Sequence, residues 1–305
     1  MKDTLVIGSR GSKLALRQAD LVRAKILVFA PEVQIQIEII KTTGDVKNDP
    51  LSVIGGKGVF TKELEDALLD KRIDVAVHSL KDLPTFIPEK LTVAAICERE
   101  DPRDALVLPI GVDRGSIQSL PEGAVVGTSS QRRSAQLKNL RPDLAIKDLR
   151  GNVDTRLRKL DEGQYDALIL AAAGLLRLGF EDRIAARIST DEILPAVGQG
   201  ALAVETRVED HSTIAIVTRL NHAPTSRCCT TERGFLHALG GGCQLPIAAL
   251  GSVSENCLTL EGLVASHDGS EVVRDKLIAS GADEESLGQK LAHLLWERGA
   301  SRLLS

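Results

Sequence analysis

The chain of 305 residues carries 38 Lys and Arg side chains against 42 Asp and Glu side chains, a formal net charge of -4. A nucleic-acid-binding protein is usually basic overall, and one Trp, one Tyr and five Phe are too few for base-stacking platforms, so we expect no nucleic-acid partner. No apolar run approaches the roughly 20 residues that span a bilayer, and no cleavable signal segment precedes the first predicted strand. We therefore expect a cytoplasmic protein with no membrane partner.

Length and cysteine content narrow the class further. Domains usually hold roughly 100 to 150 residues, so the chain has room for two or three, and 43% hydrophobic residues can fill their cores. The five cysteines are Cys97, Cys228, Cys229, Cys243 and Cys257. They form no C-x-x-C pair and have no histidines at metal-ligand spacing, so we expect neither a metal site nor disulfides.

Strand and helix patterns alternate through the first hundred residues. In chain order we expect a strand at 4–8, a helix from its cap at Ser12 to Pro31, a strand at 33–39, a helix from Thr61 and a strand at 73–77. Repeated β-α-β units favour a mainly parallel sheet. The charged stretch from Arg99 to Asp104 contains a proline and fits a crossover between domains better than the interior of an element.

A second α/β pattern follows that crossover. Its expected elements are strands at 124–127, 144–149 and 167–171 and helices at 131–140 and 153–160. Pro195 to Gly200 is typical of a return crossing, and from about Asn221 the chain predicts a helix, two or three strands and a final helix. Ligands of open parallel sheets bind beyond the carboxyl ends of the strands, so two such lobes facing each other would line a cleft with their strand-to-helix turns.

Cationic side chains lie in glycine- and serine-rich turns at those strand ends. The turns are Gly8 to Ser12, Gly55 to Gly58, Ser79 to Asp82 and Thr128 to Arg133. Small residues let backbone N–H groups approach an anion, and the N-terminus of a following helix adds to the attraction of Arg or Lys. Several such turns in an acidic chain predict a pocket for a small molecule with several anionic groups.

Five segments occur in an order that is typical of one enzyme family. They are Arg10 to Ala15, Gly55 to Gly58, His78 to Asp82, Gly127 to Arg133 and Gly241 to Gln244. Together they resemble the porphobilinogen deaminase family, also called hydroxymethylbilane synthase, from the first strand to at least Cys243. The resemblance implies an α/β fold in which two similar doubly wound, periplasmic-binding-protein-like lobes form a cleft beside a smaller C-terminal α+β domain. We expect these three domains at residues 1–99 with 197–219, 100–196 and 220–305.

The resemblance also implies a transferase and its cofactor. Four porphobilinogen molecules would be joined head to tail onto a covalent dipyrromethane primer, each with loss of ammonia. The linear product hydroxymethylbilane would then be hydrolysed from the primer, as tetrapyrrole and haem biosynthesis require. A thioether to Cys243 would hold the primer, and the enzyme would be a monomer. Each pyrrole brings an acetate and a propionate, which agrees with a pocket built from fixed cations.

The family's roles are carried onto the matching positions of this sequence. Cofactor binding is expected of Lys81, Ser129, Ser130, Arg132, Arg133 and Arg150, besides the covalent link at Cys243. Substrate binding is expected of Arg10, Ser12, Arg156, Arg177, Gln199, Lys57 and Phe60. Taken singly, an Arg next to glycine is usually a solvated surface side chain, and only the number of such turns favours a site. For Phe60, a plain glycine turn explains the sequence equally well.

Asp82 is the candidate catalytic residue. Loss of ammonia from the substrate leaves a cationic azafulvene, which a nearby carboxylate shielded from water can stabilise while it shuttles protons. From the residues alone, a surface pair between Lys81 and Asp82 would explain the dipeptide, and the family match reverses that preference. His78 follows an apolar run, so we expect a buried, hydrogen-bonded side chain rather than an acid or base.

Two other functions fit parts of the same pattern. A non-catalytic two-lobed binder of a small polyanion would also use paired α/β units and anion-binding turns. The absent signal segment, the loop cysteine Cys243 and Asp82 favour an enzyme instead. An enzyme with Lys81 as a Schiff-base nucleophile would need an apolar pocket, which Asp82 and the nearby cations argue against.

Overall fold

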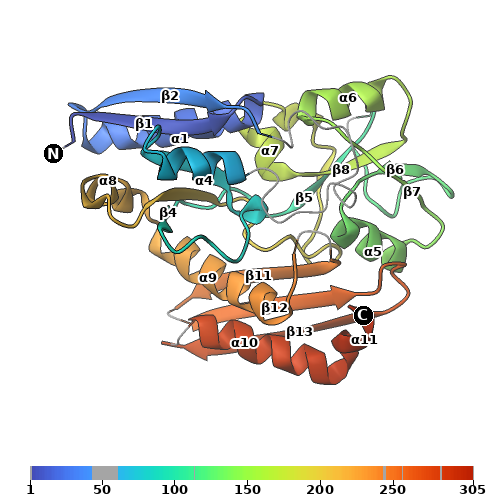
Figure 1. Ribbon diagram of the computed structural model, residues 1–305. Helices are drawn as coiled ribbons and strands as arrows, with labels where there is room; N and C mark the ends of the chain where they lie inside the picture. Colours follow the sequence, from blue (N-terminus) through green and yellow to red (C-terminus); the bar gives the residue numbers. More distant parts are fainter. Residues whose placement is uncertain are drawn as a thin grey trace. The chain divides into compact units, whose positions relative to one another are not determined.

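The structure is a computed structural model that describes residues 2–42, 61–112, 114–242, 245–255, 257–281 and 284–304. Two units are distinguished in it: unit 1 holds Met1–Arg99 and Ala201–Ser226, and unit 2 holds Glu100–Gly200 and Arg227–Ser305. The chain therefore leaves unit 1 at residue 100, returns to it at residue 201 and leaves it again at residue 227. Figure 1 shows the helices and strands of both units.

Unit 1 is built on a five-stranded sheet in the order β2-β1-β3-β10-β4. Its strands are β1 (Thr4–Arg10), β2 (Gln34–Ile40), β3 (Val75–Ser79), β4 (Leu91–Ile96) and β10 (Leu202–Arg207). Its helices are α1 (Lys13–Phe29), α4 (Lys62–Leu69) and α8 (His211–Val217), with the short turns η1 (Leu80–Asp82) and η3 (Thr218–Leu220). β1 is parallel to β2 and β3, whereas β10 is antiparallel to β3 and β4. Four strands thus share one direction, and β10, formed after the chain returns, is reversed.

Strand residues of unit 1 alternate between two hydrophobic layers, as the two-residue repeat of a strand requires. Leu5 and Ile7 lie in one layer with Val22 of α1. On the opposite face, Val6 packs against a second cluster that contains Leu64 of α4. Helices on both faces explain why β1 and β3 are largely apolar rather than strictly alternating.

The first sheet of unit 2 repeats this arrangement in the order β7-β6-β8-β5-β9. Its strands are β5 (Asp104–Val107), β6 (Val125–Gly127), β7 (Ala145–Lys147), β8 (Ala167–Ala171) and β9 (Ala186–Arg187). Its helices are α5 (Gln131–Leu140), α6 (Val153–Asp161) and α7 (Ala172–Arg177), with the turn η2 (Glu181–Arg183). β6 is parallel to β7 and β8, and β5 is antiparallel to β8 and β9. The reversed strand is again the first that the chain forms after entering the unit.

The C-terminal part of unit 2 is an antiparallel sheet in the order β11-β12-β13. Its elements are β11 (Ile247–Ser254), β12 (Cys257–Ala265), β13 (Val272–Ser280), α10 (Glu284–Leu295), the π-helix η4 (Trp296–Ala300) and α11 (Ser301–Leu303). They are preceded by α9 (Ala223–Ala238), which belongs to unit 2 from Arg227 onward. Phe235 of α9 and Leu291 of α10 share one core with the sheet. Another small core joins Ala135 of α5 to Ala248 of β11 and Leu263 of β12, so the C-terminal sheet is packed against the first sheet's helix.

The predicted fold class is confirmed: two five-stranded α/β sheets, each covered by helices, accompany a smaller antiparallel sheet with helices. The helix at 131–140 and the strand at 167–171 were predicted with the observed limits. Cys228 and Cys229 are buried in α9. The three-domain boundaries stay a prediction.

The chain passes from unit 1 to unit 2 inside the predicted crossover at residues 99–104, but the last residue of that stretch was assigned wrongly. Asp104 is the first residue of β5 and is completely buried. Its carbonyl accepts a hydrogen bond from Ile188 N–H at 2.8 Å. An acidic residue before an apolar run can start a buried strand when the fold supplies it with cationic partners.

Candidate active site

Four predicted site residues of unit 1 lie at one edge of its sheet. Arg10 ends β1, and Lys81 and Asp82 form η1 directly after β3, the parallel neighbour of β1. Ser12 caps α1, since its hydroxyl accepts a hydrogen bond from Ala15 N–H at 3.3 Å. Asp82 is exposed, whereas the other three are half-buried. Carboxyl ends of parallel strands are where open sheets bind ligands, so this edge is a candidate site.

The turn that carries Lys81 and Asp82 is fastened from several directions. Gln18 of α1 donates its side-chain N–H to the Ser79 hydroxyl at 2.9 Å. The N–H of Leu80 donates to the carbonyl of Ala201 at 3.0 Å, and Leu80 itself is buried. These contacts fix the backbone of the turn from which the exposed Asp82 side chain projects.

His78 is buried and hydrogen-bonded, as predicted. Its Nε2 lies 2.9 Å from Oε2 of Glu205, a fully buried carboxylate on the neighbouring strand β10. The pKa of Glu65 on α4 is raised, because burial disfavours its charged form and the Glu205 carboxylate adds repulsion; a hydrogen bond with Thr61 opposes both effects. The hydrogen-bonded pair of His78 and Glu205 is buried inside unit 1, which supports a structural role for His78.

In unit 2 the loop after β6 leads into the start of α5, where Ser130 is the cap. The Ser130 hydroxyl accepts a hydrogen bond from Arg133 N–H at 3.4 Å, and the Thr128 hydroxyl accepts one from Ser130 N–H at 3.2 Å. The first turn of α5 contains no acidic residue and carries Arg132 and Arg133. Cations at a helix N-terminus face the positive end of the helix dipole, so this placement is unfavourable unless an anion is nearby.

Arg132 and Arg133 are buried and share one carboxylate. Arg132 Nη2 lies 2.8 Å from Asp104 Oδ2, and Arg133 Nη2 lies 2.7 Å from Asp104 Oδ1. Only 5% and 7% of the two arginine side chains is exposed, and none of the Asp104 side chain is. Burial alone would raise the pKa of Asp104, but the two guanidinium groups hold it well below its usual range. Asp104 is therefore ionised at neutral pH.

Arg150 and Arg156 flank the start of α6, which follows β7. Arg150 Nε donates to the Asp148 carboxylate at 2.8 Å, and Arg156 Nε donates to the Gly151 carbonyl at 2.7 Å. Gly151 has a φ of 110°, a conformation that favours glycine. Burial would raise the pKa of Asp148, but hydrogen bonds from Ser129 and Arg150 lower it.

Arg177, Gln199 and Ser129 are also engaged with unit 2. Arg177 Nη2 donates to the carbonyl of Gly200 at 2.6 Å, and Gln199 Nε2 donates to Asp104 Oδ1 at 2.8 Å. The Ser129 hydroxyl donates to the carbonyl of Leu149 and accepts from its N–H, so it ties the loop after β6 to the segment after β7. β6, β7 and β8 run in one direction, and Ser130 and Arg150 follow the ends of β6 and β7 at one edge of the second sheet. Arg177 instead ends α7, the helix after β8.

Three predicted site residues, Lys57, Phe60 and Cys243, lie outside the described residues. In the described ranges, no three His, Cys, Asp or Glu side chains form a group that could hold a metal ion. Within the same ranges, no helix has the length and apolarity that crossing a membrane requires.

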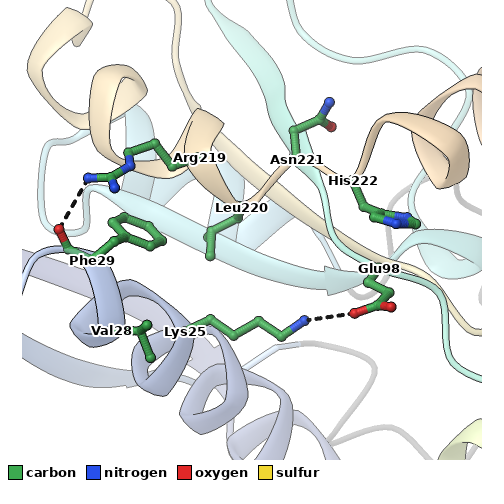
Figure 2. Close-up of a pocket in the computed structure, with 8 residues that line it drawn as sticks. All are labelled: Lys25, Val28, Phe29, Glu98, Arg219, Leu220, Asn221 and His222. Atoms are coloured by element: carbon green, nitrogen blue, oxygen red, sulfur yellow. Dashed lines mark hydrogen bonds and ion pairs between the residues drawn. The ribbon is translucent and has the colours of Figure 1, made fainter.

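Figure 2 shows a pocket of about 300 Å³ on unit 1 that none of the predicted site residues lines. It lies beside the last turn of α1, where Lys25 pairs with Glu98 at 3.8 Å. On its other side Arg219 Nη1 donates to the carbonyl of Phe29 at 3.1 Å and stacks over the Phe29 ring at 4.2 Å. Lys25 and Glu98 thus pair with each other and Arg219 contacts Phe29, and we assign the pocket no ligand.

Asp104 is the residue of this buried cluster that sequence reasoning missed. It contacts three predicted site residues, Arg132, Arg133 and Gln199, yet it was assigned to a crossover. The available signal was the apolar run Ala105 to Leu108 directly after it, which is long enough for a buried strand. An acid at the start of a buried strand needs a cationic partner, and the Arg132-Arg133 pair was already singled out.

Comparison of the sequence with known proteins identifies the family of the chain. The profile described as "Porphobilinogen deaminase, dipyromethane cofactor binding domain" matches residues 5–215, and "Porphobilinogen deaminase, C-terminal domain" matches residues 226–297. A protein of Chlorobium phaeovibrioides named porphobilinogen deaminase is 48% identical over 100% of this chain and 98% of its own length. One of the same name from Gloeobacter violaceus is 49% identical over 100% of this chain and 94% of its own.

Solved structures give a weaker likeness. A periplasmic domain of BvgS from Bordetella pertussis matches with a TM-score of 0.41 and 14% identity, over 72% of this chain and 86% of that one. Such values carry no statement about function. The sequence relatives, which cover the whole chain, decide the family.

Proposed function

The chain belongs to the porphobilinogen deaminase family, and from that premise we propose that the side chains at the two sheet edges hold the carboxylate groups of its cofactor and substrate. The enzyme is a transferase that condenses four porphobilinogen molecules head to tail with loss of ammonia and then releases hydroxymethylbilane by hydrolysis. Its dipyrromethane cofactor, when bound, supplies the covalent primer to which the first substrate is joined.

One observation carries the assignment of the cofactor's carboxylates. Arg132 and Arg133 are almost completely buried, yet among the described residues a single carboxylate, that of Asp104, pairs with both. Two positive charges against one negative charge leave a net charge of about +1 in a setting where charge is costly. Planar guanidinium groups bind carboxylates with two parallel hydrogen bonds. The donor set therefore fits the acetate and propionate groups of a dipyrromethane.

The remaining roles are proposed from the family match together with position. For the cofactor they fall to Lys81, Ser129, Ser130 and Arg150, with Cys243 as the thioether ligand. For the substrate they fall to Arg10, Ser12, Arg156, Arg177, Gln199, Lys57 and Phe60. Apart from Arg177, which ends α7, the described members of both sets lie at sheet edges, at helix starts or in the crossing near residue 200. Backbone N–H groups at helix starts can add to the attraction of the cations.

Asp82 is proposed as the catalytic residue. Its exposed carboxylate follows β3 at the same sheet edge as Arg10, on a backbone that Leu80 anchors. There it would accept a hydrogen bond from the pyrrole N–H of porphobilinogen. Bound substrate would have to shield this exposed carboxylate from water for it to stabilise the cation that remains when ammonia departs. The same oxygen atoms would take the proton that leaves the newly joined carbon.

We also propose three domains, at residues 1–99 with 197–219, 100–196 and 220–305, acting as a monomer in the cytoplasm. Three sheets with hydrophobic cores of their own support the domain division. Sedimentation equilibrium of the purified protein would test the monomer, since a dimer would double the mass of 32.7 kDa.

The mass of the denatured protein tests the proposed function most directly. After exposure to porphobilinogen, we expect a mass above 32.7 kDa by two linked pyrroles, located by peptide mapping on the peptide that contains Cys243. Cys243→Ala should stay at the unmodified mass. An unmodified wild-type chain after this exposure would contradict the proposal.

A second experiment tests the catalytic residue. Asp82→Asn keeps the shape of the side chain but removes its charge, so we expect the covalent primer to be present and ammonia release to fall by at least about a hundredfold. Ammonia release and intact mass would be measured on the same sample. Near-normal release from fully primed Asp82→Asn would remove Asp82 from this role.

A further inference from the structure

The carboxylate of Asp104 is a meeting point for three side chains that we propose to bind ligand. Arg133 Nη2 and Gln199 Nε2 donate to its Oδ1 at 2.7 and 2.8 Å, and Arg132 Nη2 lies 2.8 Å from its Oδ2. Asp104 itself is fully buried at the start of β5 and cannot reach a ligand in the solvent. It can act only through the residues that it contacts.

Arg132 is held from a second side by the segment before Pro195. Its Nη1 donates to the carbonyl of Leu194 at 2.7 Å. Gln136, one turn further along α5, donates to the same carbonyl at 3.0 Å and accepts from Leu194 N–H at 2.8 Å. Arg132 is thus held at both terminal nitrogens, by a hydrogen bond from Nη1 to the Leu194 carbonyl and by an ion pair of Nη2 with the Asp104 carboxylate.

The contacts with Asp104 and Leu194 leave one N–H donor of each arginine without a hydrogen bond. Nε of Arg132 and Nε of Arg133 are buried and have no hydrogen-bond partner among the described residues. Burial lowers the pKa of Arg132, and the Asp104 charge opposes that effect. Without Asp104, two like charges at the unfavourable end of α5 would repel each other and would lose their fixed directions.

We propose that Asp104 is a positioning residue that orients Arg132, Arg133 and Gln199 for the carboxylates of the cofactor. This inference rests on the proposed function of the two arginines. A buried acid such as Asp104 can perform two tasks. It can compensate the charge of the arginines so that the chain folds, and it can fix the direction of their N–H donors so that they bind a carboxylate. Bidentate binding of a carboxylate depends on the direction of the guanidinium plane, so the second task controls how fast the apoprotein takes up its primer.

The experiment compares covalent loading of apoprotein variants with porphobilinogen, followed by intact mass. We expect Asp104→Asn to load more slowly than wild type by about tenfold or more, the effect of losing one charge-assisted contact. Asp161→Asn is the matched control, because Asp161 pairs with Arg183 through both oxygens at 3.1 and 2.7 Å in the same unit but contacts no proposed site residue in these pairings. Circular dichroism and the melting temperature of each apoprotein report folding.

A second pair of variants separates positioning from charge compensation. Arg133→Gln and the double variant Arg133→Gln/Asp104→Asn differ only at Asp104, and the double variant keeps the net charge of about +1 that wild type has in this cluster. If Asp104 positions Arg132, the double variant loads more slowly than Arg133→Gln. If it only compensates charge, the double variant loads at least as fast, which would overturn the inference even where Asp104→Asn alone fails to fold.

Covalent loading of the wild-type protein distinguishes a failure of the proposed function from a failure of the role of Asp104. Wild type that acquires no adduct would overturn the proposed function and this inference together. Normal loading of wild type and of a folded Asp104→Asn variant would overturn only the role of Asp104.

Discussion

Glu232 on α9 is expected to hold together two segments of unit 2 that are distant in sequence. It is fully buried, and its Oε2 accepts a hydrogen bond from Gly198 N–H at 2.7 Å, while its Oε1 accepts one from Gly251 N–H at 2.8 Å. Gly198 precedes Gln199, so this carboxylate supports the segment that also contacts Asp104. We predict that Glu232→Gln weakens that support.

The magnitude follows from counting acceptors. The amide of Glu232→Gln has one oxygen, which can accept from one glycine N–H, and its NH₂ group then faces the other N–H without bonding. A hydrogen bond to a charged group contributes about 1.5–3 kcal/mol, and the N–H left unpaired in the interior is part of that cost. At about 1.4 kcal/mol for each factor of ten, one of the two amides should lose about 10- to 150-fold of its protection against hydrogen exchange.

Hydrogen exchange followed by mass spectrometry on peptides that contain Gly198 and Gly251 would measure this loss. Glu89→Gln is the control, because Glu89 is exposed in the loop before β4. The melting temperature should fall for Glu232→Gln and stay unchanged for the control. Unchanged protection of both glycine amides in Glu232→Gln would refute the reasoning.

Two further predictions concern local features of unit 2. A hydrogen bond from Arg141 lowers the pKa of Asp143 to about 2, so its contribution to stability is present above the ordinary value of about 3.9 and is lost as the pH falls through 2. A carboxyl-carbon NMR titration should show this midpoint and its return towards 3.9 in Arg141→Ala; an unchanged midpoint would contradict the cause. Gly251→Ala should lower the free energy of unfolding by about 1–3 kcal/mol, because the added Cβ would lie 2.9 Å from Cys228 Cα. Thermal unfolding checks this prediction. Gly242→Ala is the control, since its added Cβ would meet no atom within 4 Å.

Much of the local structure was determined by the sequence. The caps at Ser12 and Ser130 depend on a hydroxyl and an N–H three residues apart, and both are found as hydrogen bonds of that kind. The helix at 131–140 and the strand at 167–171 were predicted because periodicity and turn residues act within a few residues of each other. Five short motifs in the order typical of the family were enough to indicate it, because each motif and its place in the chain can be recognised without knowing the tertiary structure.

Only the tertiary structure decided which distant groups meet. Glu205 lies 127 residues from His78, and Asp104 lies 29 residues before Arg133; neither pairing leaves a pattern in the local sequence. In both five-stranded sheets the reversed strand is the one formed after a crossover, which residue periodicity cannot reveal because it is the same for either strand direction. Long-range pairs of this kind depend on which surfaces the whole chain can bury together after the entropy of loop closure is offset. For that reason the arginines were recognised from the sequence, whereas the carboxylate that orients them was not.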